Sequence, residues 1–196
     1  RKYGFHGTSH KYITGEMQER LVKKDVNLII CHVGSGASIS AVKDGKCFDT
    51  TMGLTPLGGF MMGTRSGGVD PSAVTFIMKN ENLTPDEMDA ILNKQSGVQA
   101  ISGISSDDRD ICKAQEEGDE RAILAHEMQA YEIAKFIGSY VAAMNGVDAI
   151  VFTGGIGENA PNCREEVCEN MEYLGIKIDK AANDFKGELK KISTPD

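Results

Sequence analysis

Three glycine-containing turns in this sequence could bring the peptide backbone close to a charged ligand. They lie at Gly34–Gly36, within Gly53–Gly68 and at Gly154–Gly157. Each follows, or lies beside, a run of residues that is typical of a strand. Turns without Cβ atoms let main-chain N–H groups approach phosphate oxygens, and a following helix N-terminus adds partial positive charge. The pattern therefore favours nucleotide binding.

Two familiar phosphate-binding fingerprints are missing from the chain. No segment matches GxxxxGK[ST], so a P-loop is excluded, and the GxGxxG pattern of Rossmann domains does not occur either. A single glycine turn is weak evidence, because such turns are common in all sheets. The argument for a nucleotide depends on three of them in one chain.

His6 and Arg65 are the side chains whose surroundings favour charge handling. His6 and His10 are four residues apart, a spacing that can bind zinc on a helix, but no third ligand is fixed nearby and Gly7 interrupts the helix start. The alternative for both is a capping or core histidine. Arg65 lies in a segment with six glycines, which favours a ligand contact over a solvated surface position.

A charge cluster at Asp107–Asp110 precedes an expected helix. It can be interpreted as a ligand contact or as a solvated group at a helix start. His126 lies inside the longest expected helix, where a satisfied helix histidine is the simplest interpretation. The Met-rich stretch Phe60–Met62 is interpreted as core.

The expected elements alternate between helix and strand. A helix is predicted over residues 8–24, with Thr8 and Ser9 as candidate caps. Three strands in antiparallel succession follow, with a hairpin turn at Lys43–Lys46. Their predicted ranges are 27–33, 37–42 and 47–51.

The second part of the chain is predicted to be mainly helical. Residues 53–71 form a loop, and helices begin after Asp70 and at Thr84, where Glu87 has the capping-box spacing. The longest helix is expected from about Asp119 to Asn145. Its predicted apolar stripe contains Leu124, Met128, Tyr131, Ala134, Ile137, Val141 and Met144.

The last predicted elements complete an α/β order. A buried strand over residues 147–152 leads into the third glycine turn, and a helix then runs from Pro161 to near Gly175. Strand, glycine turn and helix in this order indicate one mixed α/β domain rather than two domains.

Composition narrows the class of protein. Of the 196 residues, 40% are apolar and 26% charged, and the net charge is −8. The negative charge argues against nucleic acid or an anionic membrane as the main partner. Five cysteines without a CxxC pair indicate reduced thiols. Together with the lack of a signal peptide and of a long apolar run, this predicts a cytoplasmic protein.

Six segments in register resemble the acetate kinase family. The match covers nearly the whole chain, and no single segment would establish it. The segments are Phe5–His10 (FHGTSH), His32–Gly36 (HVGSG), Asp49–Pro56 (DTTMGLTP), Met62–Gly67 (MGTRSG), Ser105–Asp110 (SSDDRD) and Gly154–Asn159 (GGIGEN).

The resemblance implies a role for each matching residue. His6 is similar to the histidine that stabilises the transferring phosphoryl group, and Arg65 to the arginine that neutralises charge there. The implied nucleotide contacts are His32, Val33, Gly34, Ser35 and Gly36, then Asp107, Asp108 and Arg109, then Gly155, Ile156, Gly157, Glu158 and Asn159. Two positions depart from the family pattern, because Ser35 replaces the usual Asn and Asp108 replaces a hydrophobic residue.

The resemblance also implies a fold and an activity. The fold is a ribonuclease-H-like α/β domain of the actin, sugar kinase and hsp70 superfamily, with a mixed sheet flanked by helices. Residues 1–196 correspond to the C-terminal nucleotide-binding and catalytic domain, with the N-terminal domain and the extreme C-terminus absent. The expected reaction is reversible ATP-dependent phosphorylation of acetate with Mg²⁺, whose ligands are expected outside this chain.

Other functions remain open at this level. The chain is also compatible with a propionate or butyrate kinase, although the Met62–Gly67 segment favours acetate or propionate. A different alternative is a non-catalytic nucleotide-binding module that forms a homodimer through this domain. The fragment is expected to be inactive alone.

Overall fold

The computed structural model describes residues 2–187 and 189–195, which divide into two compact units. The first unit contains residues 2–5, 35–38 and 50–129; the second contains residues 6–34 and 39–49 and the described residues from 130 onward. The prediction of one mixed domain stays a prediction, and the division into units has a physical cause. Residues 61–125 include an apolar cluster of their own, formed by Met61, Val98, Ile111, Ala122 and Ala125.

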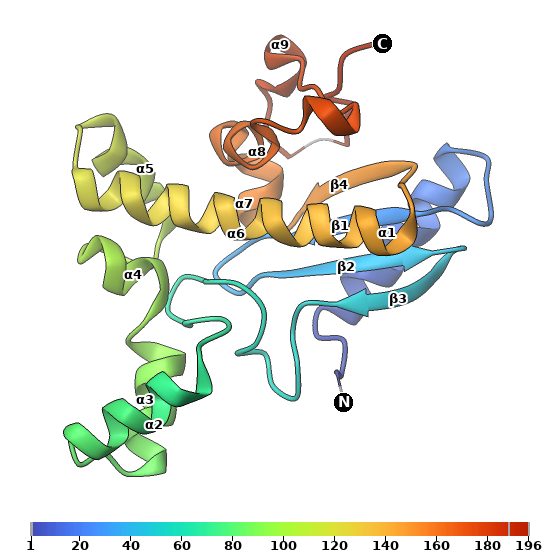
Figure 1. Ribbon diagram of the computed structural model, residues 1–196. Helices are drawn as coiled ribbons and strands as arrows, with labels where there is room; N and C mark the ends of the chain where they lie inside the picture. Colours follow the sequence, from blue (N-terminus) through green and yellow to red (C-terminus); the bar gives the residue numbers. More distant parts are fainter. Residues whose placement is uncertain (1, 188, 196) are drawn as a thin grey trace. The chain divides into compact units, whose positions relative to one another are not determined.

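The four strands form one mixed sheet (Figure 1). Its strand order is β3-β2-β1-β4, and β4 pairs with β1 in parallel. The five-residue connection from β1 to its neighbour β2 is too short for a parallel crossover, so this pair is antiparallel as predicted. The strands are β1 (Leu28–His32), β2 (Ser38–Lys43), β3 (Lys46–Thr50) and β4 (Ala149–Thr153).

The turn between β2 and β3 follows the predicted hairpin chemistry. Asp44 and Gly45 both adopt positive φ, 51° and 71°, which is the conformation of a two-residue type I′ turn. In the second unit, Leu28 and Ile30 of β1 belong to an apolar cluster against which Ile13 and Met17 of α1 (Gly7–Arg20) pack.

Helix α1 (Gly7–Arg20) is shorter than predicted and starts differently. The prediction that it extends to residue 24 is wrong, because Val22 adopts a φ of 50° and the chain turns back. The predicted caps Thr8 and Ser9 are also wrong. The N-cap is His6, in the left-handed region, and its side chain makes no cap hydrogen bond.

The helices of the first unit begin where their capping residues predict. Residues 51–70 contain no helix or strand. Helix α2 (Pro71–Asn80) starts with Asp70 accepting from the Ser72 N–H, and α3 (Pro85–Lys94) has the predicted capping box between Thr84 and Glu87. Two further helices complete this part, α4 (Gly97–Ser102) and α5 (Asp108–Glu116).

Helix α6 (Glu120–Met144) exists as predicted, but the first half of its predicted apolar stripe is wrong. Leu124, Met128 and Tyr131 are exposed by 48%, 37% and 66%. Two polar residues, His126 and Gln129, lie on the buried face instead, with hydrogen bonds that an apolar pattern cannot reveal. The buried residues of α6 are Ala122, Ala125, His126, Gln129, Ala130, Ile133, Ile137, Tyr140 and Met144.

The chain after β4 forms short helices rather than one long one. The segment predicted as a glycine turn is itself helix α7 (Gly154–Asn159). The next helix, α8 (Pro161–Cys168), ends seven residues before Gly175, because Asn170 adopts a φ of 62°. A 3₁₀ turn (Glu172–Leu174) and α9 (Lys180–Asn183) follow. Among the described residues, no helix has the length and apolar character needed to cross a membrane.

Gly97 packs against the long loop of the first unit, residues 51–70, and a substitution there tests this contact. Its φ is 67°, and a Cβ there would overlap the Met62 carbonyl oxygen and lie 2.9 Å from that of Arg65. Gly97→Ala should therefore lower the free energy of unfolding by about 2 kcal/mol or more. Urea denaturation measures this change.

Gly138→Ala is the matched control for that substitution. Gly138 lies inside α6 with open space around its Cβ position, so alanine should raise stability by up to about 1 kcal/mol. Equal stability of the two variants would show that the Gly97 backbone imposes no constraint.

Candidate functional site

Two of the predicted nucleotide loops leave from neighbouring strand ends in the second unit. His32 at the end of β1 lies opposite Thr153 at the end of β4. The Val33 N–H donates to the Thr153 carbonyl at 2.8 Å, and the N–H groups of Ile156 and Gly157 donate to the Val33 carbonyl at 2.9 and 3.0 Å. The structure thus brings the two loops together at the carboxyl edge of parallel strands, where α/β proteins bind ligands.

Gly154 allows these loops to approach each other. Its φ is 81°, and a Cβ there would lie 2.7 Å from the Val33 carbonyl oxygen and 3.1 Å from the His32 ring. At this glycine the close approach is therefore to the neighbouring strand rather than to a ligand. Gly155 is exposed, with open space where a Cβ would be, so its backbone remains accessible.

The polar side chains of α7 are engaged within the helix. The Glu158 carboxylate accepts from the Thr153 hydroxyl at 2.7 Å and from the Gly154 N–H at 3.1 Å. The Asn159 amide donates to the Gly155 carbonyl at 2.9 Å. These bonds stabilise the first turn of the helix, and a nucleotide contact by Glu158 or Asn159 stays a prediction.

Three histidines gather beside the first of these loops. The rings of His6 and His32 stack with their centroids 4.1 Å apart, and the His10 centroid lies 6.4 and 6.2 Å from them. The Ser9 hydroxyl and His32 Nδ1 form a hydrogen bond of 2.9 Å. His6 and His32 are half-buried and His10 is buried. The cluster joins the start of α1 to the end of β1.

Burial keeps His10 and His32 largely uncharged. The pKa of His10 is lowered to about 4, mainly by burial and further by the neighbouring His32 and His6. Burial also lowers the pKa of His32, an effect that Glu158 partly opposes. Because a buried imidazolium has lost its hydration, the neutral forms are favoured near pH 7.

Arg164 positions α7 and was missed by sequence reasoning. It is 1% exposed, and its guanidinium donates to the Gly157 carbonyl at 2.9 Å and to the Asn183 side chain and carbonyl at 2.7 and 2.8 Å. Burial lowers its pKa. A lone arginine in a polar helix carries no signal of this role; only the fold brings the acceptors to it.

Parts of three predicted segments converge in the first unit. The Gly63 N–H donates to the Ser35 carbonyl at 3.2 Å. A Cβ on Gly63 would lie 3.2 Å from the Ser106 carbonyl oxygen and 3.3 Å from that of Ser35. Backbone at Ser35 of the His32–Gly36 segment and at Ser106 of the Ser105–Asp110 segment therefore meets at Gly63 of the Met62–Gly67 segment.

Arg65 is half-buried in a loop that the backbone holds in place. The Ser96 N–H donates to the Thr64 carbonyl and the Val98 N–H to the Met62 carbonyl. The guanidinium contacts the Pro56 carbonyl at 3.4 Å and the Met62 sulfur at 3.6 Å. Among the described residues it forms no ion pair with a carboxylate, so its charge can still serve an anionic ligand.

Asp107 and Arg109 form an exposed ion pair at the start of α5. Asp107 accepts from the backbone N–H and from Nε of Arg109, both at 3.0 Å. The bonds to Arg109 hold the pKa of Asp107 at about 2, and the pair raises the pKa of Arg109. The solvated-cluster interpretation fits this pair, and its proposed contact with adenosine stays a prediction.

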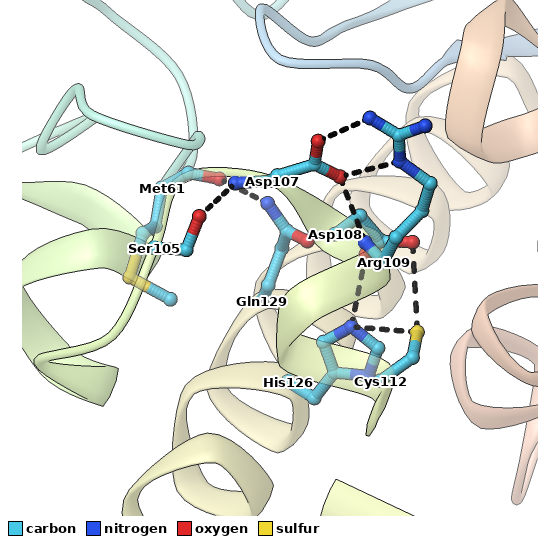
Figure 2. A network of polar contacts seen from close by, with 8 residues as sticks. All are labelled: Met61, Ser105, Asp107, Asp108, Arg109, Cys112, His126 and Gln129. Carbon is cyan, nitrogen blue, oxygen red and sulfur yellow. Dashed lines mark hydrogen bonds and ion pairs between the residues drawn. The ribbon is translucent and has the colours of Figure 1, made fainter. Parts of the chain in front are cut away.

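Asp108 has a different set of contacts from its two neighbours (Figure 2). Its Oδ1 lies 3.0 Å from Nε2 of His126, which is buried as expected of a helix histidine. Its Oδ2 lies 3.6 Å from the Cys112 sulfur. Nearby, the Gln129 amide donates to the Met61 carbonyl at 3.0 Å. The network connects α5, α6 and the long loop within the first unit.

The remaining predicted residues fall in both units. His6, His32, Val33 and Gly34 belong to the second unit with the Gly154–Asn159 segment. Arg65 and the acidic segment belong to the first, as do Ser35 and Gly36. Ser35 is exposed and Gly36 is half-buried.

Comparison with known proteins gives a consistent match. A family model described as the acetokinase family matches residues 1–196. The chain is 56% identical over 199 residues to the acetate kinase of Bacteroides thetaiotaomicron and 56% identical over 201 residues to that of Thermotoga maritima. Each match covers 100% of this chain and 50% of the relative. The chain therefore spans about half the length of the curated relatives it matches.

Solved structures agree with the sequence matches. The acetate kinase of Porphyromonas gingivalis is 48% identical with a TM-score of 0.97, covering 100% of this chain and 50% of that one. A propionate kinase from Francisella tularensis is 47% identical with a TM-score of 0.90, covering 93% and 47%. These likenesses confirm the predicted fold class.

The histidine cluster predicts a pH effect on stability. Because the pKa of His10 is lowered in the folded state, the unfolded state takes up its proton first as the pH falls below 6.5. The stability contributed by the neutral ring is thus lost progressively between about pH 6.5 and pH 4. The free energy of unfolding should fall between pH 7 and pH 5, and His10→Gln should make this fall smaller by about 2 kcal/mol.

Urea denaturation of both proteins at the two pH values measures this effect. An unchanged pH dependence in His10→Gln would contradict it. Tyr12→Gln is the control, because Tyr12 lies exposed on the same helix and its loss should leave the pH dependence as it is.

Proposed function

The chain belongs to the acetokinase family, and from this premise we propose that it supplies the nucleotide-binding part of an ATP:acetate phosphotransferase. The reaction is reversible transfer of a phosphoryl group from ATP to acetate, giving ADP and acetyl phosphate. The relatives with this name are twice as long as the chain. We therefore expect the isolated chain to bind nucleotide without turning it over.

The paired ends of β1 and β4 are the observation that supports this proposal most directly. Val33 accepts two N–H groups from α7 and donates to Thr153, so the two loops have a fixed separation. Main-chain groups at such a strand edge suit a polyphosphate, because they need no rearrangement when the ligand arrives. We propose that residues 32–36 and 155–159 contact the phosphates of ATP.

The proposed chemistry needs positive charge and hydrogen-bond donors rather than a nucleophilic side chain. A carboxylate oxygen of acetate attacks the γ-phosphorus while the bond to the bridging oxygen of ADP breaks. Negative charge is spread over the equatorial oxygens in the transition state. We propose that His6 and Arg65 stabilise that charge, and that Asp107, Asp108 and Arg109 contact adenosine.

Mg²⁺ is the metal that the proposed reaction requires. Among the described residues, the one group of three ligating side chains near enough to share an ion contains the Cys112 thiol and the His126 imidazole. Mg²⁺ takes oxygen ligands instead, so this group does not fit it. We expect the Mg²⁺ ligands outside this chain, and the roles given to His6 and Arg65 do not depend on them.

Two further features belong to the proposal. The exposed Leu124, Met128 and Tyr131 of α6 are apolar side chains in the part of the chain expected to form a homodimer. The five free thiols suit a reducing compartment, so we place the reaction in the cytoplasm.

Acyl-chain selectivity is the main alternative within enzymes. The propionate kinase from Francisella tularensis has nearly the same identity to this chain as the acetate kinase from Porphyromonas gingivalis. Rates of the full-length protein with acetate, propionate and butyrate discriminate the candidates. We expect the largest kcat/KM with acetate.

The roles of His6 and Arg65 can be tested by substitution in the full-length protein. His6→Ala and Arg65→Ala should each lower kcat by about 10²- to 10³-fold, the cost of removing a donor aimed at transition-state charge. Hydroxamate detection of acetyl phosphate measures kcat, and calorimetry should show that ADP still binds.

Arg20→Ala is the control for these variants, because Arg20 is an exposed residue at the end of α1. Its kcat should stay within about twofold of the parent. Full activity of either His6→Ala or Arg65→Ala would reject the role given to that residue. Turnover by the isolated chain would reject the view that it needs the rest of the protein.

The proposed dimer makes a separate prediction. Replacing Met128 and Tyr131 together by Asp should shift the full-length protein from dimer to monomer, since burying two carboxylates without partners is unfavourable. Sedimentation velocity measures the shift. Ser139→Asp on an exposed position of the same helix is the control. A dimer that survives the double change would place the interface elsewhere.

A further inference from the structure

We propose that Asp108, Cys112 and His126 form a binding site for a zinc-class transition-metal ion, a property separate from the proposed phosphoryl transfer. All three residues belong to the first unit. Asp108 and Cys112 lie four residues apart on α5, a spacing that puts both side chains on one helix face. His126 faces them from α6. The three side chains therefore converge from two helices.

One carboxylate oxygen of Asp108, the Cys112 sulfur and a ring nitrogen of His126 all lie within 4.8 Å of one another. Asp108 Oδ1 lies 3.0 Å from His126 Nε2, Asp108 Oδ2 lies 3.6 Å from Cys112 Sγ, and Cys112 Sγ lies 4.0 Å from His126 Nε2. Zinc bonds of about 2.0–2.3 Å at tetrahedral angles require about 3.3 to 3.6 Å between ligand atoms. Side-chain rotations that bring one Asp108 oxygen toward both partners would reach these separations.

Figure 2 shows how the three groups close a triangle. The carboxylate of Asp108 faces the imidazole through one oxygen and the thiol through the other. The third dashed line joins the thiol to the imidazole. The three side chains thus gather around one small region, where a single ion could contact all of them.

Burial and charge also suit a divalent ion. The side chain of His126 is 4% exposed and that of Asp108 is 16% exposed, so an ion here would be largely shielded from water. A thiolate and a carboxylate together carry two negative charges. They balance the charge of a divalent ion, while the imidazole binds it in its neutral form. Cys112 is half-buried, which leaves a fourth position for water.

The chemistry of the ligands selects the class of ion. Thiolate and imidazole favour zinc and cobalt, whereas Mg²⁺ and Ca²⁺ prefer oxygen. The contact between the thiol and the carboxylate gives little stability by itself, because S–H is a weak donor. A hydrogen-bonded Asp108–His126 pair without metal is the competing explanation.

The ion would join the first turns of α5 to α6. Asp108 lies between Asp107 and Arg109, and all three are proposed to contact adenosine. A bond from Asp108 to an ion held by His126 would fix the start of α5 against α6. The site therefore has a structural position next to the proposed nucleotide contact, although its metal binding can be measured without nucleotide.

Cobalt(II) is the probe that tests the site in the full-length protein. After treatment with a chelator, addition of Co²⁺ should produce a thiolate-to-cobalt charge-transfer band that saturates at one equivalent. Zn²⁺ should abolish the band by displacement, and a large excess of Mg²⁺ should leave it in place. Absence of any such band in the folded parent protein would overturn the proposal.

Substitutions assign the band to these residues. Cys112→Ser should abolish it, and Asp108→Asn and His126→Gln should each weaken Co²⁺ binding by at least about tenfold. Cys47→Ser is the matched control, because Cys47 is an exposed free thiol, and it should leave the band unchanged. A band that persists in Cys112→Ser would place the metal elsewhere and overturn the proposal.

A second readout separates metal binding from loss of fold. Zn²⁺ should raise the melting temperature of the parent and of Cys47→Ser, because a ligand that binds only the folded state stabilises it. It should not raise that of Cys112→Ser, whose circular dichroism reports whether the variant is folded. Equal Zn²⁺ shifts in the parent and Cys112→Ser would contradict the site.

Discussion

The parallel ladder between β1 and β4 is the interaction on which the second unit depends. It joins segments more than one hundred residues apart and ends with His32 opposite Thr153. Beyond the last pair, Val33 continues the hydrogen bonding into α7 instead of releasing the chain to solvent. Glycine at position 154 is required there, because any Cβ would meet the neighbouring strand. The loops are therefore rigid because they prolong the sheet. Gly154 is needed for the packing of these loops, whether or not a ligand is bound.

A comparable constraint organises the first unit without a sheet. Gly97 has a positive φ and packs against the carbonyls of Met62 and Arg65, while the N–H groups around it bond to the same loop. A segment rich in glycine would otherwise be costly to order. Its backbone bonds to the start of α4 offset that cost. Among the residues that the structure describes, the Arg65 guanidinium makes two weak contacts.

The sequence predicted those elements that depend on residues close together in the chain, such as helix caps and the hairpin turn. The helix start next to Asp70, the cap at Thr84, the Asp44–Gly45 hairpin and all four strands agree with the structure. The end of α1 and the identity of its cap depend on tertiary packing, and no spacing revealed them. The buried face of α6 was missed because His126 and Gln129 are polar, and their partners come from distant segments. The site motifs were found through family resemblance; their convergence at Gly63 and Val33 needed the fold.

Arg164 gives the second unit an uncommon kind of coupling. Among the described residues its buried guanidinium is hydrogen-bonded to neutral acceptors, on α7 at Gly157, on α9 at Asn183 and just beyond α9 at Phe185. A guanidinium cannot discard its proton at physiological pH, so losing either set of acceptors leaves a buried cation poorly solvated. Displacement of α9 therefore has an electrostatic cost. Because the same guanidinium also holds Gly157, that displacement would weaken the support of α7, directly after β4. Through this one side chain, the order of the segment near residue 183 is coupled to the order of α7.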